Sequence, residues 1–304
     1  MQEKEKKNNR EDTVKDFKGK VAVITGSASG VGRSLAFRLG REGVKIMLAD
    51  IEHDALERTQ GELREAGIEA EAQVTDVSNP DSVEALAERS FSRYGQIHLV
   101  FNNAGIGAGG GANLWDSSLK AWHWGFNVNV FGVVHGIHSF VPRLLKQNVE
   151  AHIVNTASGA GLVFPPSAGI YCATKAAVIA ITEVLHFHLQ AQNSPVKAGI
   201  LFPGPHVVDT GLFNSGRNRP AELTDPGDTG HGITSLEDMQ QIMVQMTGKR
   251  IDVTHPDEVA ETAYQALVED KYWAQVVSEK LAKGIRDRYE GIIAGTTPYP
   301  ADIL

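Results

Sequence analysis

The residues whose types and spacing could do chemistry lie in the middle of the chain, at Tyr171 and Lys175 with Ser158 upstream. Tyr171 and Lys175 are four residues apart, so on a helix they share a face and lie one turn apart. A free phenol titrates near pH ~10, and a neighbouring ammonium favours the phenolate. The pair is therefore suited to moving a proton to or from a substrate oxygen. The alternative is an ordinary pair on a helix surface.

The segments around Ser158 predict how these side chains meet. The apolar run 151–157 predicts a buried strand, which places Ser158 at a carboxyl end, where open parallel sheets have their sites. Glycines and prolines at 159–166 predict a loop, and helix formers with apolar residues at helical spacing predict a helix over 173–190. The serine and the tyrosine are thereby expected to converge.

A glycine-rich turn at 25–32 follows a predicted strand at 21–24 and opens a predicted helix at 34–41. Gly26, Gly30 and Gly32 lack a Cβ, so the backbone can approach a pyrophosphate closely at a helix N-terminus, where the helix dipole favours an anion. The stretch therefore predicts a dinucleotide-binding turn.

Asp50 ends a second predicted strand at 44–49. A carboxylate at this point can accept hydrogen bonds from the ribose hydroxyls of a dinucleotide. The alternative is that Asp50 caps the helix predicted over 52–65.

Together these residues resemble the short-chain dehydrogenase/reductase family in its compact single-domain form. The resemblance covers roughly residues 19–212, with a last strand near 272–277. Its landmarks are Thr-Gly-x-x-x-Gly-x-Gly at 25–32, the acidic strand end at Asp50, Asn-Asn-Ala-Gly at 102–105, the helix asparagine Asn129, and Ser158 with Tyr171 and Lys175.

The resemblance implies a doubly wound, mostly parallel Rossmann-type α/β sheet flanked by helices, and hydride transfer between NAD(H) and a secondary alcohol or ketone. Tyr171 is expected to exchange the proton, Lys175 to lower its pKa and hold the ribose, Ser158 to orient the substrate oxygen, and Asn129 to support a water route. A homodimer or homotetramer through helices 124–146 and 173–190 is also implied. The implied cofactor-binding residues are Gly26, Ser29, Gly30, Val31, Gly32, Asp50, Ile51, Asp76, Val77, Asn103, Ala104, Gly105, Tyr171, Lys175, Pro203, Gly204, Val208 and Thr210.

One departure from the family pattern concerns the nicotinamide end. The family has a threonine four residues after the glycine that follows its sixth strand, whereas Thr210 lies six after Gly204. The candidates for contacts to the nicotinamide amide are therefore Pro203, Gly204 and one of Val207, Val208 or Thr210.

Asp50 predicts a preference for NAD, because its carboxylate would repel the 2′-phosphate of NADP. The four residues that follow it, 51–54, contain no arginine or lysine that could offset this repulsion. Arg33 and Arg38 in the first helix could reach the site, so NADP is disfavoured but not excluded.

Residues 213–249 are expected to form a substrate cap, either a mobile lid or an ordinary amphipathic helix on the core. The apolar loop 162–166 and the methionines of this segment predict a pocket for a bulky, apolar or aromatic substrate. A catalytically silent dinucleotide-binding sensor or scaffold protein is the alternative function, although such a protein has no reason to keep all four catalytic side chains. Dehydratase or epimerase chemistry is disfavoured by the glycine spacing and the lack of a second domain.

Composition sets the remaining expectations. The chain has 304 residues, 42% of them hydrophobic, and no composition shift, which predicts one oxidoreductase domain at 17–304 after a charged, mobile tail at 1–16. A net charge of -8 argues against a protein that binds nucleic acid. The sequence contains no apolar run of about 20 residues, so a membrane span is not expected. A single cysteine and charged opening residues predict a cytoplasmic protein without an internal disulfide. No metal is expected, because His135 and His138 have no third ligand at a suitable spacing.

Overall fold

The computed structural model describes residues 16–108, 113–224 and 235–298. Nearly all of the predicted tail at 1–16 and a part of the predicted cap at 213–249 lie outside these ranges.

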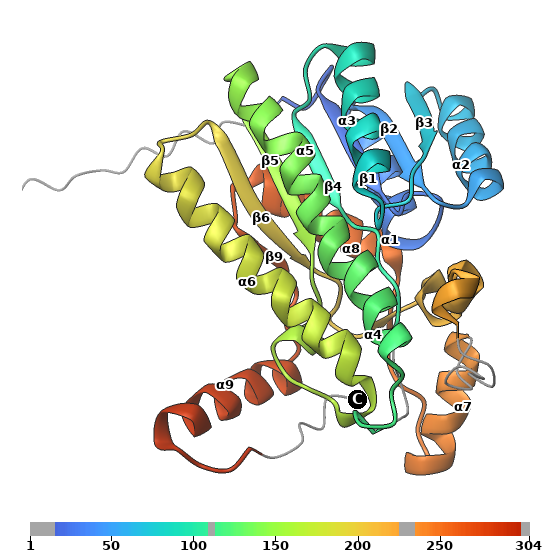
Figure 1. Ribbon diagram of the computed structural model, residues 1–304, viewed down its shortest axis with the longest axis vertical. Coiled ribbons are helices and arrows are strands. Elements are labelled where there is room, and N and C mark those ends of the chain that lie inside the picture. Colours follow the sequence, from blue (N-terminus) through green and yellow to red (C-terminus); the bar gives the residue numbers. More distant parts are fainter. Residues whose placement is uncertain (1–15, 109–112, 225–234, 299–304) are drawn as a thin grey trace, which may run out of the picture.

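The centre of the molecule is a seven-stranded sheet in the order β3-β2-β1-β4-β5-β6-β9 (Figure 1). Each strand pairs parallel with its neighbours, and the order reverses direction between β1 and β4. This is the doubly wound topology of a Rossmann-type sheet, so the predicted fold class is confirmed. The strands are β1 (Val21–Thr25), β2 (Lys45–Asp50), β3 (Ala70–Val74), β4 (Leu99–Asn102), β5 (Ala151–Thr156), β6 (Val196–Phe202) and β9 (Trp273–Gln275).

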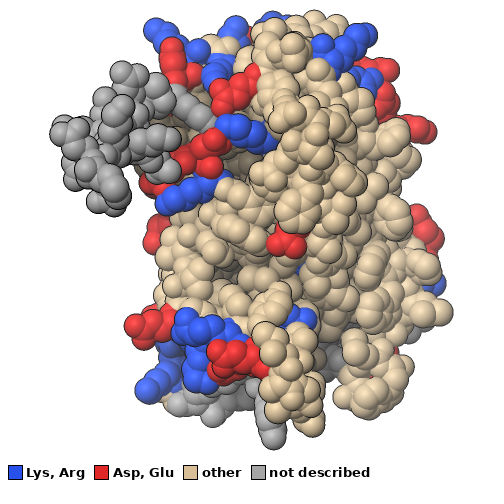
Figure 2. Space-filling view, turned by 90° about the vertical axis from the view of Figure 1, so that its left-hand side faces the viewer, with Lys and Arg blue, Asp and Glu red and all other residues tan. Residues whose placement is uncertain are grey.

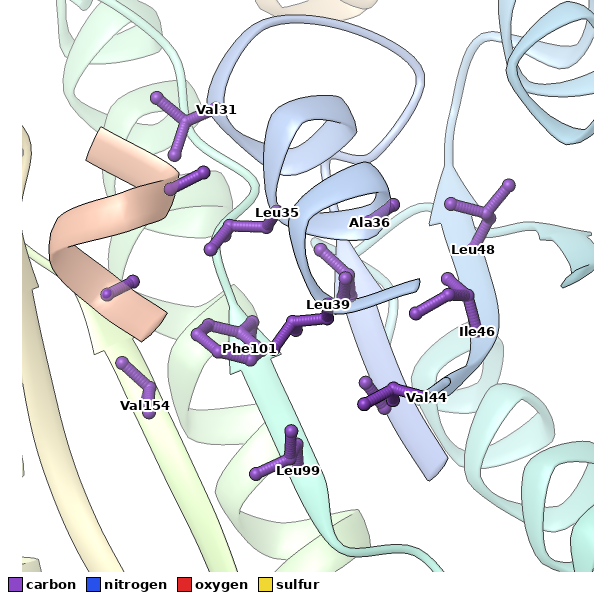
Figure 3. Packing of buried hydrophobic residues seen from close by; sticks show 14 of the residues in the cluster. Val31, Leu35, Ala36, Leu39, Val44, Ile46, Leu48, Leu99, Phe101 and Val154 are labelled. Carbon is purple, nitrogen blue, oxygen red and sulfur yellow. The ribbon is translucent and has the colours of Figure 1, made fainter. Parts of the chain in front are cut away.

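Helices cover both faces of the sheet. One face carries α1 (Gly30–Gly40), α2 (His53–Glu65) and α8 (Pro256–Val268), and the other carries α3 (Pro80–Tyr94), α5 (Gly132–Gln147) and α6 (Gly169–Ala191). Between α1 and the sheet, Leu35 and Leu39 pack against Phe101 (Figure 3). Each fully buried leucine of this kind contributes about 1.5–3 kcal/mol of hydrophobic stabilisation. The near-continuous apolar strands are explained by this burial on both faces.

The stretch 119–146, which includes the helix expected over 124–146, is divided in the structure. It consists of α4 (Leu119–Phe126), a π-helical turn (Asn127–Phe131) and α5. In the π-helical turn the amide of Gly132 donates to the carbonyl of Asn127, five residues back, so the turn holds one residue more than an α-helical turn. A continuous apolar pattern does not reveal this widening.

The helix α6 begins in the loop that was expected to precede it, at Gly169 instead of residue 173, so Tyr171 lies in its first turn. Within the described residues, the stretch Pro166–Ala191 is long and apolar enough to cross a membrane by length and composition alone. Its inner side packs on the sheet and on α5 through Val178 and Ile179.

The cap follows β6. It contains two 3₁₀ segments (Gly211–Asn218 and Ala221–Leu223), then α7 (Leu236–Thr247), and is tied to the body by a two-stranded pairing of β7 (Val207–Val208) with β8 (Val253–Thr254). The last helix is α9 (Glu279–Ala294), which lies below α6 at the lower left of Figure 1. The two short strands β7 and β8 were not expected from the sequence, since two residues carry no recognisable alternation.

Candidate active site

A cavity of about 930 Å³ lies at the carboxyl ends of the parallel strands, between the sheet and the cap. This is where doubly wound sheets bind ligands, and the volume is at the upper end of the roughly 300–1,000 Å³ typical of ligand pockets. We call one side the sheet wall: the glycine turn 25–32, the strand ends 50–52, 102–106 and 156–158, and the first turns of α6. The opposite side, residues 210–224 with α7, is the cap wall.

The glycine turn has the backbone that the sequence predicts. Gly26 and Gly30 have φ angles of 66° and 52°, in the left-handed region that favours glycine. A Cβ on Gly26 would stand 2.7 Å from the Cα of Ala104, so a side chain there would push two strand ends apart. The turn leads directly into α1, whose first amides and dipole offer an anion site at the cavity.

Thr25 and Asn103 brace this turn against the end of β4. The hydroxyl of Thr25 accepts hydrogen bonds from the amides of Asn103 (2.9 Å) and Ala104 (3.1 Å), and it donates to the carbonyl of Phe101 (3.3 Å). The side-chain amide of Asn103 donates back to the carbonyl of Thr25 at 3.0 Å. Residues 102–105 are thereby fixed beside the glycine turn.

The carboxylate of Asp50 lies at the end of β2 and is held by two backbone amides. It accepts hydrogen bonds from Ala28 (2.9 Å) and Glu52 (3.1 Å). Burial raises the pKa of Asp50, although these hydrogen bonds oppose the shift. The alternative that Asp50 caps α2 is wrong, because the residue at the N-cap is Glu52.

Ser158, Tyr171 and Lys175 converge on the same cavity. The ammonium of Lys175 is buried, donates to the carbonyl of Thr156 at 2.9 Å and lies 5.7 Å from the centre of the Tyr171 ring. Burial raises the pKa of Tyr171 to about 12, although a hydrogen bond with Ser158 opposes it, and burial lowers the pKa of Lys175 to about 8. The pKa of the phenol is thus raised by desolvation, whereas the pairing with Lys175 was expected to lower it.

Asn129 lies behind the cavity wall and not in it. Its side-chain oxygen accepts from the amide of Ile106 (2.8 Å), and its nitrogen donates to the carbonyl of Ile106 (3.0 Å) and to the hydroxyl of Thr174 (3.1 Å). The side chain is 1% exposed. Its amide therefore ties the end of β4 to α6, next to Lys175.

The structure brings the other predicted site residues together. They come from six separate parts of the chain, and all line the one cavity described above. These residues are Gly26, Ser29, Gly30, Val31, Gly32, Asp50, Ile51, Asp76, Val77, Asn103, Ala104, Gly105, Ser158, Tyr171, Lys175, Pro203, Gly204, Val208 and Thr210.

The cap wall supplies residues that the sequence analysis missed. Ser215 is buried, and its hydroxyl accepts from the amide of Gly107 at 3.2 Å. Arg217 and Asn218 donate to the carboxylate of Glu52, the second residue after Asp50, with the Asn218 contact at 3.0 Å. These partners are more than 100 residues apart in sequence, so no local pattern could have indicated them.

Arg33 and Arg38 are engaged away from Asp50. The guanidinium of Arg33 pairs with Glu62 at 2.6 Å, and that of Arg38 pairs with Glu42 at 2.7 Å and with Glu261. The arginine that the fold brings to this end of the cavity is Arg217, from the cap.

Part of the cavity wall is apolar. The indole of Trp124 in α4 is buried, and the guanidinium of Arg219 lies 5.3 Å from the centre of that ring. Further apolar side chains from the cap and from α9 line the cavity: Leu212, Phe213, Leu223, Met239, Met243 and Leu281.

The donor set fits a nicotinamide dinucleotide. The amides at the start of α1 suit a pyrophosphate, Asp50 suits ribose hydroxyls, and Lys175 suits a second ribose. Across the described residues, no three histidine, cysteine, aspartate or glutamate side chains group as metal ligands would. The fold and the cavity together define a dinucleotide-binding oxidoreductase.

Comparison with known proteins identifies the family. The model of the short chain dehydrogenase family matches residues 20–220. A CLA biosynthesis dehydrogenase/reductase of Lactiplantibacillus plantarum is 31% identical over 287 residues, which are 94% of this chain and 97% of that protein. A 1-deoxy-11-beta-hydroxypentalenate dehydrogenase of Streptomyces avermitilis is 38% identical over 263 residues, 84% of this chain and 93% of that protein. The chain belongs to the short-chain dehydrogenase/reductase family.

A solved structure of the same family is similar to this chain in sequence and in fold. The short chain dehydrogenase/reductase of Burkholderia phymatum, determined in complex with NAD, is 41% identical to this chain and superimposes with a TM-score of 0.83. The match covers 94% of this chain and 98% of that one. The similarity supports a nicotinamide dinucleotide as the cofactor.

Proposed function

We propose that the protein transfers a hydride between NAD(H) and a bulky, apolar or aromatic secondary alcohol or its ketone. The observation that carries this proposal is the convergence of Ser158, Tyr171 and Lys175 on a cavity that also contains the glycine turn and Asp50. When bound, the nicotinamide supplies the hydride chemistry. The chain's own residues bind, orient and move the proton.

Tyr171 is the proton donor and acceptor in this proposal. With a pKa of about 12, its phenol is protonated at neutral pH and ready to give its proton to a ketone oxygen. In the oxidation direction the phenol must instead accept a proton, so alcohol oxidation should accelerate as the pH rises. The Ser158 hydroxyl, which hydrogen-bonds Tyr171, is placed to share the substrate oxygen, and the ammonium of Lys175 lies 5.7 Å from the centre of the Tyr171 ring.

Asn129 is a positioning residue in this proposal. All three of its hydrogen bonds hold Ile106 and Thr174, and Thr174 directly precedes Lys175. Its effect on the reaction is therefore exerted through the placement of Lys175 and of the strand end. A water route through Asn129 remains a prediction.

The preference for NAD over NADP rests on Asp50. Its carboxylate is fixed at the end of β2 by the amides of Ala28 and Glu52, so it cannot easily turn away from a 2′-phosphate. Steady-state kinetics with both cofactors test this, and an equal or higher kcat/KM with NADP would overturn it.

The apolar side chains that line the cavity from the cap and from α9 support a bulky, apolar or aromatic substrate. The relative from Streptomyces avermitilis is named as a 1-deoxy-11-beta-hydroxypentalenate dehydrogenase, and the one from Lactiplantibacillus plantarum for CLA biosynthesis. A panel of bulky secondary alcohols and ketones, assayed by nicotinamide absorbance, tests the proposal. No turnover with any member, together with tight cofactor binding, would favour the silent sensor or scaffold instead.

We also propose a cytoplasmic homodimer or homotetramer that assembles through α5 and α6. Large apolar side chains on these helices are exposed: Phe131 just before α5, and Val184 and Phe187 on α6. Figure 2 shows a broad central part of one face with few charged side chains, between charged groups above and below. A monomer by light scattering at micromolar concentration would refute the assembly.

A further inference from the structure

The ribose end of the cavity carries a charge arrangement that the sequence does not show. Asp50 ends β2, Glu52 is the N-cap residue of α2, and Arg217 of the cap wall reaches Glu52 from 165 residues away. One nitrogen of Arg217, Nη2, donates to the carboxylate of Glu52, and Asn218 donates to the same oxygen at 3.0 Å. The contact joins the two walls beside the carboxylate that is assigned to the ribose.

The carboxylate of Glu52 does not cap its own helix. Although Glu52 is the N-cap residue of α2, its side chain makes no capping hydrogen bond. Burial works against its ionised form, but the hydrogen bonds from Arg217 and Asn218 and the charge of Arg58 hold its pKa below the usual range. Glu52 is therefore an anion whose principal partner is a cap arginine.

The guanidinium of Arg217 does not depend on Glu52 for its position. Its second terminal nitrogen, Nη1, donates to the carbonyls of Gly211 (3.0 Å) and Asn214 (2.7 Å) within the cap. If the charge of Glu52 were removed, these two hydrogen bonds would keep Arg217 at the ribose end, and its Nη2 would be held less strongly by residue 52.

We propose that Glu52 is a second determinant of cofactor choice, because it occupies the guanidinium of Arg217, which could otherwise bind the 2′-phosphate of NADP. Asp50, Glu52 and Arg217 together carry one net negative charge, which a phosphate of about two negative charges would meet at close range. Without the charge of Glu52 the group is neutral and offers an arginine, the residue best suited to phosphate recognition. This inference rests on the proposed preference for NAD.

The test measures binding, so that it does not depend on knowing the substrate. Dissociation constants for NADH and NADPH are measured by fluorescence titration with the full chain and with Glu52→Gln. We expect the substitution to tighten NADPH binding roughly tenfold or more, because the 2′-phosphate would gain one charge-assisted hydrogen bond, and to change NADH binding little. Glu52→Ala, which also removes the acceptor oxygen, should show at least the same gain.

Two further variants test whether a gain in NADPH binding comes from Arg217 or only from the loss of one negative charge. Glu57→Gln removes the same charge from the same helix, where Glu57 is largely exposed and faces His53 at 3.3 Å, and it should leave both dissociation constants unchanged. Combining Glu52→Gln with Arg217→Met should abolish the gain for NADPH, since the released guanidinium is then absent.

The outcomes separate the inference from the proposed function. A wild type that prefers NADH, with a Glu52→Gln variant that behaves like Glu57→Gln, overturns the inference and leaves the role of Asp50 intact. A gain for NADPH that survives in the double variant also overturns it, because Arg217 is then not the ligand. A wild type that binds NADPH as tightly as NADH overturns the cofactor proposal itself, and the inference with it.

Discussion

The sheet wall and the cap wall hold their side chains by different means. In the sheet wall, Thr25 and Asn103 exchange several hydrogen bonds across neighbouring strand ends, and glycines allow backbone to touch backbone. The cap wall is attached at a few separate points, chiefly Ser215 on Gly107 and Arg217 on Glu52. Apart from the pairing of β7 with β8, these contacts depend on a few side chains. The comparison suggests that cofactor geometry is built into the core, whereas substrate fit depends on a wall that few contacts hold.

The largest expected effect is on the sheet wall. Tyr171→Phe should lower turnover by roughly 10²–10⁴-fold, since it removes only the oxygen that carries the proton. Cofactor affinity, measured by NADH fluorescence, should stay within about twofold because the ring remains. Tyr264→Phe is the control, because its ring packs with Phe17 and Arg38 on the far side of α1. A Tyr171→Phe variant that keeps more than a tenth of the wild-type rate would refute the role of the phenol.

The next effect tests the rigidity of the sheet wall. Gly26→Ala should lower the free energy of unfolding by roughly 2–5 kcal/mol, because the residue has a positive φ and its Cβ would meet the backbone of Ala104. Gly61→Ala is the matched control: it lies within α2, nothing lies within 4 Å of its Cβ position, and it should stabilise by up to about 1 kcal/mol. Denaturant unfolding measures both. Equal stability of the two variants would contradict the close packing of the turn.

A smaller effect is expected on the cap wall. Ser215→Ala removes the hydroxyl that bonds Gly107, and it should raise the substrate KM roughly threefold to tenfold at unchanged NADH affinity. Ser117→Ala, whose hydroxyl donates to the carbonyl of Asn113 at an exposed site, should change neither value. If cofactor affinity fell together with substrate affinity, the two walls would not be independent.

The smallest expected effect is on how the free energy of unfolding depends on pH through Lys175. Native Lys175 releases its proton near pH 8, whereas the unfolded chain keeps it until about pH 10.5, so between these values the unfolded state binds more protons and stability rises with pH. The gain between pH 8 and 9 should be about 1 kcal/mol for the cofactor-free protein. Lys175→Met should lack this contribution, as judged by denaturation at both pH values. The same slope in both proteins would mean that Lys175 is not the group responsible.

What the sequence predicts well is local. The glycine turn, Asp50, the asparagine stretch at 102–105 and the Tyr171–Lys175 spacing each combine side chains with the element that positions them, within a few residues. Long apolar strands and helices were also found within a few residues of their observed ends, since burial on both faces leaves a strong pattern.

What the sequence does not predict depends on distant partners or on solvation. The contact of Glu52 with Arg217 arises only when the cap folds back over the glycine turn, where Thr210 also comes within 3.0 Å of the Cβ position of Gly30. The raised pKa of Tyr171 likewise follows from burial, which residue spacing does not report. Asn129 could be identified, yet only the structure shows that its side chain faces Ile106.

The π-helical turn at Asn127–Phe131 constrains how this part of the chain can change in length during evolution. Deleting one residue there would convert it to an ordinary α-helical turn and rotate α4 against α5 by about 100°. Trp124 would then turn away from the cavity, or Phe140 away from the sheet, because the two helices could no longer both keep their buried sides. Alignments of relatives should therefore show substitutions but few gaps between Leu119 and Gln147, whereas the cap should vary freely in length.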